Sequence, residues 1–233
     1  MQLFVGTSGY SYKEWKGSFY PKDLSPKDML PFYAQHFAAV EINGSFYRLP
    51  TVATVKAWTT QVPENFQFIL KSPQTITHFK RLKEPKALLK PFLKIAATLK
   101  ERRGPLYFQL PGNFKKDLAR LDTFLAALKG AGPITFEFRH ASWFDDESFS
   151  LLRKHACALC INDSEESPFT DIVSTAKWGY LRLRRGKYTD KQLAAWLKNI
   201  RAQKWTRAYI FFMHEDTGTG PKLANRFLKL AEK

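Results

Sequence analysis

Eight short apolar segments recur along the chain, and helix-like stretches or loops separate them. Within the segments, apolar residues alternate as in a β-strand, whereas connections such as 114–129 space their leucines by three and four residues. This alternation predicts an α/β fold, a single (β/α)₈ TIM-type barrel somewhat below the ~250 residues typical of the class. A doubly wound open sheet is the alternative. The expected strands are 3–7, 40–43, 66–71, 106–110, 134–140, 156–161, 179–184 and 208–213, and the expected helices are 26–37, 51–61, 85–103, 114–129, 145–155, 189–203 and 221–232.

No linker, low-complexity block or shift in composition divides the chain, so we expect residues 1–233 to form one domain. No apolar run reaches the ~18 residues that span a bilayer, and the first residues enter a strand with no signal-peptide core. These features predict a cytoplasmic protein that does not insert into a membrane. Cys157 and Cys160 form a C-x-x-C, but extended backbone would separate their Cα atoms by roughly 10 Å. We therefore expect two buried structural thiols.

Several expected strands carry charged and amide side chains near their carboxyl ends, on the face opposite their main row of apolar residues. In a parallel barrel that face lines the interior, and sites form at this end because the βα loops converge there. An internal salt-bridge network, in which Glu41 and Glu137 neutralise the cations, is the alternative to a functional site. Burying so many charges is costly unless they are well paired, which favours a functional use. The residues are Glu41, Asn43, Lys71, Gln109, Glu137, Arg139, Arg182 and Arg184.

Two loops near the expected mouth have the composition of a phosphate site. Arg184 opens the segment R-R-G-K, and Gly218 and Gly220 precede the last expected helix. Phosphate groups bind in these barrels after strands seven and eight, at helix amides and nearby cations. No common metal-binding spacing occurs, so we assign no metal site. Asp163 and His214 are the weak candidates.

The chain is strongly basic, with 37 Lys and Arg against 21 Asp and Glu, for a formal net charge of +16. This balance favours an anionic small molecule or nucleic acid as a partner, although it also suits a merely soluble basic protein. The aromatic loops, which include Tyr47 and Trp143, have two interpretations. They are platforms that stack on bases or sugars, or they pack the rim of the barrel.

Several motifs together resemble the YecE-like family, domain of unknown function 72. The resemblance covers essentially the whole chain and implies a TIM-type barrel with a polar pocket at the strand carboxyl ends. It also marks Arg48 and Asn225 as substrate-binding candidates, but it implies no established reaction and no cofactor. The segment 212–216 departs from the family pattern, so no role is carried over to it. The matching motifs are G-T-S-G (6–9), F-Y-P (19–21), V-E-I-N (40–43), F-Y-R-L-P (46–50), T-H (77–78), Q-L-P (109–111) and E-F-R-H (137–140), with Trp15, Lys71, Trp143, Tyr180, Arg182, Gly220 and Asn225.

These features support two main hypotheses. The first is an enzyme, a hydrolase or phosphodiester-acting enzyme for instance, on a phosphate-bearing substrate such as nucleic acid. Glu137 is its general acid or base, and His140 is a second proton carrier. Glu41 is a further catalytic candidate. Lys71, Arg139 and Arg182 stabilise negative charge. The second is a non-catalytic module that binds nucleic acid or an anionic ligand; a scaffold for partner proteins has only the aromatic rim in its favour.

Overall fold

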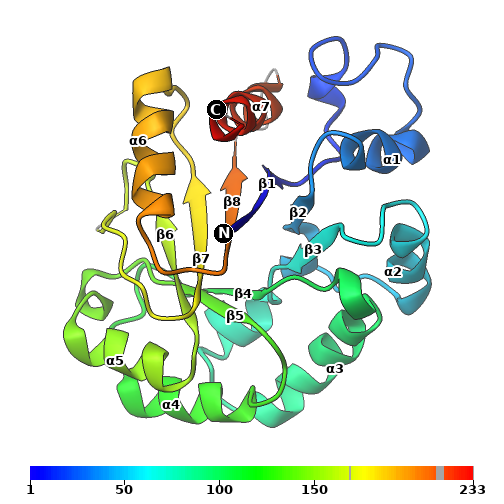
Figure 1. Ribbon diagram of the computed structural model, residues 1–233. Helices are drawn as coiled ribbons and strands as arrows, with labels where there is room; N and C mark the ends of the chain where they lie inside the picture. Colours follow the sequence, from blue (N-terminus) through cyan, green and yellow to red (C-terminus); the bar gives the residue numbers. More distant parts are fainter. Residues whose placement is uncertain (168, 214–217, 233) are drawn as a thin grey trace.

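Eight parallel strands form a nearly closed barrel in the computed structural model, which describes residues 1–167, 169–213 and 218–232 (Figure 1). They pair in the order β3-β2-β1-β8-β7-β6-β5-β4. Between β3 and β4 the ring is completed by the single bridges Phe68–Arg103 and Lys71–Tyr107. The predicted TIM-type barrel is confirmed, and the open sheet is excluded. The strands are β1 (Gln2–Ser8), β2 (Ala39–Ile42), β3 (Gln67–Leu70), β4 (Leu106–Gln109), β5 (Ile134–Glu137), β6 (Ala158–Asn162), β7 (Trp178–Leu183) and β8 (Arg207–Phe212).

Seven α-helices lie in the described residues, and they lie outside the strands (Figure 1). Their apolar sides form one large core with the outward faces of the strands. Between β6 and β7, the described part of the connection contains no helix, whereas every other connection has one. The helices are α1 (Met29–Ala34), α2 (Val52–Thr59), α3 (Pro85–Ala97), α4 (Leu118–Ala127), α5 (Asp146–Lys154), α6 (Asp190–Arg201) and α7 (Thr219–Ala231).

Several helices are shorter than expected, and local chemistry explains three of the boundaries. Pro31 has no N–H to donate to the preceding turn, and the expected helix 26–37 divides into a 3₁₀ turn, Pro26–Asp28, and α1. Helix α3 ends at Ala97, before Lys100 takes a left-handed backbone with φ of 51°. Helix α4 begins at Leu118 because the Asp117 side chain accepts a hydrogen bond from the Arg120 amide and caps it.

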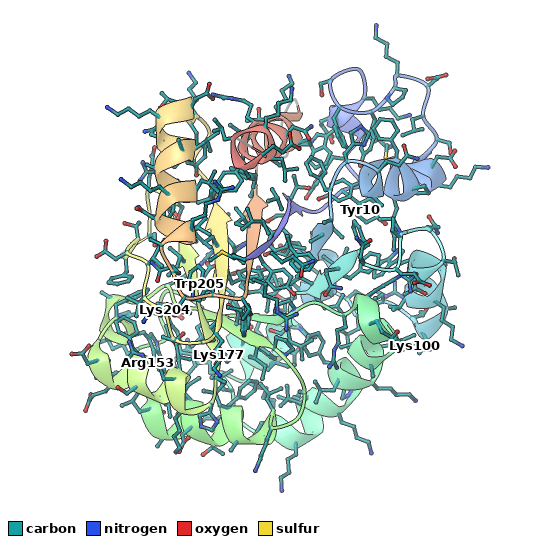
Figure 2. All side chains as sticks on the ribbon, viewed as in Figure 1. Tyr10, Lys100, Arg153, Lys177, Lys204 and Trp205 are labelled. Atoms are coloured by element: carbon teal, nitrogen blue, oxygen red, sulfur yellow. The ribbon has the colours of Figure 1, made fainter. Side chains whose placement is uncertain are left out.

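Side chains fill the barrel interior (Figure 2). The two-residue period of the strands places them in layers. At the bottom, the rings of Phe4 and Tyr209 stack with their centroids 4.8 Å apart. Higher up, the rings of Tyr107 and Tyr180 stack at 5.6 Å. Two residues further along its strand β7 supplies Arg182, so the aromatic layers form the floor beneath a layer of charged residues.

Candidate functional site: a cationic pocket at the barrel mouth

Arg182 lies at the centre of a buried ionic layer. Its guanidinium donates to Glu41 Oε1 and to Glu137 Oε2, both at 2.9 Å, and to the Tyr107 hydroxyl oxygen at 2.8 Å. Tyr180 donates its hydroxyl to Glu41 Oε2 at 2.6 Å, and Ser8 donates to Glu41 Oε1 at 2.9 Å. Both glutamates are 0% exposed and Arg182 is 2% exposed. The carboxylates and the two terminal guanidinium nitrogens of the layer therefore have the paired geometry that buried charges require.

The Glu137 carboxylate is fully occupied as a hydrogen-bond acceptor. Oε1 receives bonds from the Gln109 amide at 2.7 Å, the Asn162 amide at 3.1 Å and Arg139 Nε at 3.1 Å. Oε2 receives bonds from the Tyr107 hydroxyl at 2.5 Å and from Arg182. Burial acts to raise the pKa of Glu137, but the Arg182 and Arg139 guanidiniums and the hydroxyl outweigh it and hold this pKa well below its ordinary value.

Directly above this layer is a pocket of about 520 Å³, here called the mouth pocket. Lys71 follows β3 and projects into it, and its ammonium donates to Gln109 Oε1 at 3.0 Å and lies 4.3 Å from the centre of the Phe46 ring. Burial, followed by the charge of Arg182, lowers the pKa of Lys71 to about 8. The mouth pocket is lined by Asn43, Phe46, Tyr47, Lys71, Gln74, His78, Phe79, Gln109, Arg139, Arg182, Arg184 and Met213.

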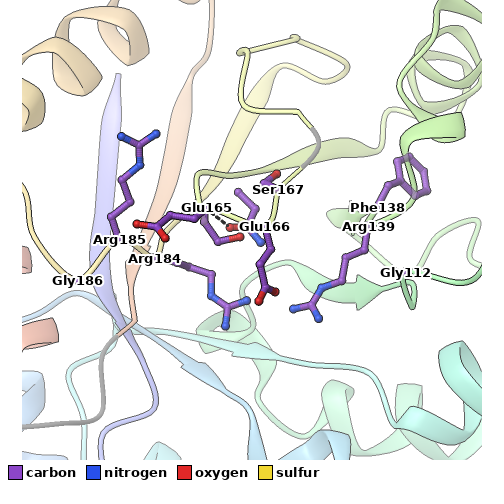
Figure 3. Close-up of a pocket in the computed structure, with 11 residues that line it drawn as sticks. Gly112, Phe138, Arg139, Glu165, Glu166, Ser167, Arg184, Arg185 and Gly186 are labelled. Atoms are coloured by element: carbon purple, nitrogen blue, oxygen red, sulfur yellow. Dashed lines mark hydrogen bonds between the residues drawn. The ribbon is translucent and has the colours of Figure 1, made fainter.

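A second pocket of about 620 Å³ adjoins the mouth pocket, and both are lined by Arg139 and Arg184. Figure 3 shows Arg139, Arg184 and Glu166 extending toward the same space, with Glu166 carried by the loop after β6. Within the described chain, neither arginine forms an ion pair with Glu166. The Arg184 guanidinium has no hydrogen-bond partner there, because only its backbone amide is engaged, by Asp163. Two cations thus face open space between the pockets.

Two residues of the mouth pocket carry buried polar atoms that lack a hydrogen-bond partner in the described structure, namely Arg182 Nε and Asn43 Oδ1. One is a donor and the other an acceptor. An unpartnered buried polar group costs about 1–3 kcal/mol, so such groups are expected where a ligand or water completes them. Their position at one pocket strengthens the case for a binding site.

The alternation of residues along the expected strands predicted which site residues face the barrel interior, and the structure places them there. Glu41, Glu137, Gln109 and Arg182 form the buried layer, and Asn43, Lys71, Arg139 and Arg184 line the pocket above it. Tyr47 also lines the pocket and is 76% exposed. The structure brings these nine residues together, but it does not assign their chemistry.

Trp143 fits the packing interpretation of the aromatic loops and not the stacking one, and His140 lines neither pocket. Trp143 is 0% exposed, stacks on Phe138 with ring centroids 4.6 Å apart, and donates its indole N–H to the Phe114 carbonyl. It is a packing residue rather than a substrate-binding one. His140 Nδ1 accepts a hydrogen bond from the Ser142 amide at 3.1 Å and so caps the short 3₁₀ turn Ala141–Trp143. It lines neither pocket, which argues against a proton-carrying role.

The remaining candidates lie apart from the mouth pocket. Asp163 is 0% exposed and accepts hydrogen bonds from the Tyr188 hydroxyl and the Arg184 amide, so it anchors the loop after β7. Across the described residues, no cluster of His, Cys, Asp and Glu could hold a metal ion. Gly218 caps α7 and packs against Ser18. Gly218 does not line the mouth pocket. The same is true of the candidates Gly220, Asn225 and Arg48. His214 falls outside the described residues.

Some residues that contact or line the site were not among the site candidates, although one of them, His78, belongs to a matching motif. Tyr107 and Tyr180 each lie two positions before an inward-facing residue of the same strand, Gln109 and Arg182 respectively. The two-residue period could therefore have identified both tyrosines as inward-facing partners of the carboxylates. His78 and Phe79 lie in the short π-helical turn Thr75–Phe79 after β3, for which the sequence has no recognisable period. Both line the mouth pocket, and burial and Lys71 lower the pKa of His78 to about 4.

None of the helices in the described part of the chain has the length and apolar character to cross a membrane. Cys157 and Cys160 are both buried and free, as expected.

Comparison with known proteins places this barrel among proteins of similar architecture. The family model described as "Protein of unknown function DUF72" matches residues 4–233. UPF0759 protein YunF of Bacillus subtilis is 30% identical, with 99% of this chain and 95% of that protein covered. UPF0759 protein YecE of Escherichia coli is 36% identical over 143 residues, and the match covers 61% of this chain but only 50% of that protein.

Among solved structures, a DUF72 family protein from Thermotoga maritima has a TM-score of 0.87 and 26% identity, and the alignment covers 100% of both chains. The match in sequence extends over nearly the whole chain, and the match in fold extends over all of it. The chain therefore belongs to the DUF72 family, and the resemblance seen in its motifs is confirmed.

Proposed function

We propose that the protein is an enzyme acting on a small phosphate-bearing substrate held in the mouth pocket. One observation carries this proposal: Lys71, Arg139, Arg182 and Arg184 line the same pocket, and no acidic residue of the described chain lines it. Counting these four cations against Glu41 and Glu137 beneath them leaves a formal charge of +2, from 4 − 2. Cations in a partly enclosed site bind phosphate strongly because the surroundings screen them less than water does.

The size of the pocket supports a small ligand. Its volume of about 520 Å³ falls within the range of ~300–1,000 Å³ that holds metabolites and cofactors. Arg139 and Arg184 supply guanidiniums that can bind two phosphate oxygens each. Arg182 is fixed by two carboxylates, so its part is to hold a positive charge at a constant position. Such preorganised charge stabilises anionic transition states without reorganisation.

Lys71 is better suited than Glu137 to exchange protons with the substrate. With a pKa of about 8, roughly a tenth of its side chains are neutral at pH 7, so both protonation states are available. Glu137 has a strongly lowered pKa, no exposed surface and no free lone pair. We therefore reassign Glu137 as a positioning residue that orients Gln109, Arg139 and Arg182, and Lys71 becomes the proton carrier.

Calorimetric titration with inorganic phosphate tests the site. K71M and R184M should each weaken phosphate binding about 5–10-fold, which corresponds to about 1–1.4 kcal/mol. E166Q should strengthen it, because the carboxylate that extends toward the two arginines competes with the ligand. K198M on the exposed face of α6 is the matched control and should leave affinity unchanged. A wild-type protein that binds no phosphate, or four variants with equal affinity, contradicts the proposed site.

Turnover is tested separately, with a panel of phosphorylated metabolites followed by mass spectrometry. The proposal predicts a product that forms with wild-type protein and K198M but not with K71M. A panel in which no compound is converted while phosphate still binds would favour a binding protein.

A non-catalytic nucleic-acid module is the second candidate, and the aromatic rim favours it. Tyr47 and Phe79 are 76% and 69% exposed, and both line the mouth pocket. Exposed rings beside cations are typical of single-strand binding, where each stacked base contributes about 1–3 kcal/mol. This candidate predicts that a short single-stranded oligonucleotide binds with steep salt dependence and that Y47A weakens its binding.

A further inference from the structure

Lys71 differs from Arg182 and Arg139, the two site cations that are paired with carboxylates, in having no carboxylate partner within the described residues. Arg182 is paired with Glu41 and Glu137, and Arg139 is paired with Glu137. Within the described residues, the contacts of the Lys71 ammonium are a neutral amide oxygen at 3.0 Å and aromatic rings whose centres lie 4.3 and 5.7 Å away. A lysine kept as a counter-ion would lie next to a carboxylate. This one is instead surrounded by neutral groups and by arginines.

Such an environment favours a neutral amine. Removing an ammonium from water costs free energy, and neighbouring guanidiniums repel it, so both effects release its proton. Arg182 and Arg139 lower the pKa of Lys71 in addition to burial, whereas the two glutamates act in the opposite direction without prevailing. Lysines desolvated beside another cation are the ones that enzymes use as amine nucleophiles toward carbonyl groups.

The geometry of the mouth gives the amine and the phosphate-binding groups separate positions. Lys71, Phe46 and His78 belong only to the mouth pocket, whereas Arg139 and Arg184 line both that pocket and its neighbour. A substrate with its phosphate between the two arginines can therefore extend its other end toward Lys71 within the mouth pocket.

We propose that Lys71 is an amine nucleophile that forms an imine with the aldehyde or ketone of a phosphorylated carbonyl substrate. This inference rests on the phosphate site proposed above. The neutral amine adds to the carbonyl carbon, and one N–H proton moves to the carbonyl oxygen. The second N–H proton then leaves with that hydroxyl group as water, and a C=N bond forms. One water is released for each imine, and no oxidant or reductant is consumed.

Trapping by borohydride tests the inference on the full chain. The protein is incubated at pH 7 with glyceraldehyde 3-phosphate and sodium borohydride, which reduces an imine to a stable secondary amine, and adducts are located by peptide mass spectrometry. At pH 7 an amine of pKa about 8 is neutral roughly two orders of magnitude more often than an exposed lysine. The expected result is one adduct per chain, on Lys71, formed at least tenfold faster than on Lys198.

Two variants make the assignment specific. K71R keeps a positive charge but has no amine, so it should give no adduct at this position while it retains more phosphate affinity than K71M. K198M should be trapped at Lys71 like wild type. Adducts spread over exposed lysines at similar rates, with no enrichment on Lys71, overturn the inference.

Unphosphorylated glyceraldehyde and inorganic phosphate separate this inference from the proposed function. If glyceraldehyde is trapped on Lys71 as readily as the phosphorylated aldehyde, and inorganic phosphate does not compete, the amine nucleophile stands and the phosphate site fails. If inorganic phosphate binds in the titration but no carbonyl probe is trapped on Lys71, the phosphate site stands and the nucleophile fails.

Discussion

Replacing Arg182 with methionine removes the cation at the centre of the ionic layer while keeping an unbranched apolar stem that reaches about as far as Nε. The change breaks ion pairs of 2.9 Å to both Glu41 and Glu137. Glu137 keeps Arg139 at 3.1 Å, whereas Glu41 loses the cation that pairs with it in the described structure. Leaving one member of a buried pair uncompensated costs about 3–5 kcal/mol. At about 2–4 °C for each kcal/mol in a chain of this size, we expect Tm to fall by about 6–20 °C.

The loss should depend on pH in a defined direction. In the wild type, the pKa of Glu137 is lower in the folded than in the unfolded chain, so its contribution to stability is present above the ordinary value near 4.5 and disappears as pH falls. Arg182 is the cation that lowers this pKa most. The free energies of unfolding of R182M and wild type should therefore differ most near neutral pH and converge below about pH 4.5.

Urea unfolding between pH 2.5 and 8 measures this difference. R182K, which keeps a charge but fewer donors, should lie between R182M and wild type, and the double variant R182M/E41Q should recover part of the loss because it removes the unpaired carboxylate. A difference below 1 kcal/mol at pH 7, or one that is the same at every pH, would refute the reasoning.

Two further predictions follow from the placement of individual residues. Cys157 and Cys160 are buried, and burial raises the pKa of both thiols, so neither should react with a thiol reagent such as Ellman's reagent in the folded protein, whereas both should react in denaturant. H140A should lower stability by about 1 kcal/mol through loss of its cap to Ser142 while leaving phosphate affinity unchanged; weakened phosphate binding in this variant would return His140 to the site.

The barrel and its charged interior could be predicted from sequence because both depend on short-range periodicity. Glu41, Glu137 and Arg182 occupy alternate positions of apolar strands, and a parallel barrel turns that alternation into a common inner face. Their mutual distances follow from the closure of the sheet. No additional information about tertiary contacts was needed to bring them together.

The loops around the mouth could not be predicted in the same way. His78 and Phe79 follow β3 in a segment with five-residue hydrogen-bond spacing, which has no recognisable sequence period. Trp143 and His140 belong to the connection after β5, and side chains in such a connection can turn into the pocket or back onto the core. Trp143 turns back onto the core because it packs on Phe138, a contact that sequence alone does not reveal.

The division of roles between Glu137 and Lys71 was equally inaccessible from sequence. Both are inward-facing charged residues near strand ends. Their pKa values move away from ordinary values for reasons that require distances: Glu137 lies against two guanidiniums, whereas Lys71 has no carboxylate beside it. From sequence alone a carboxylate is therefore the natural first choice for proton transfer, and we propose the amine in its place.

The titration of the Lys71 amine, with and without inorganic phosphate, tests the mouth pocket most directly. Trace labelling with acetic anhydride between pH 6 and 11, read by peptide mass spectrometry, gives the pKa of each lysine in one experiment. We predict that Lys71 titrates near 8, below the ordinary lysine pKa of about 10.4, and that phosphate raises the Lys71 pKa and slows its labelling. A Lys71 amine that titrates with the exposed lysines and is unaffected by phosphate would contradict the account.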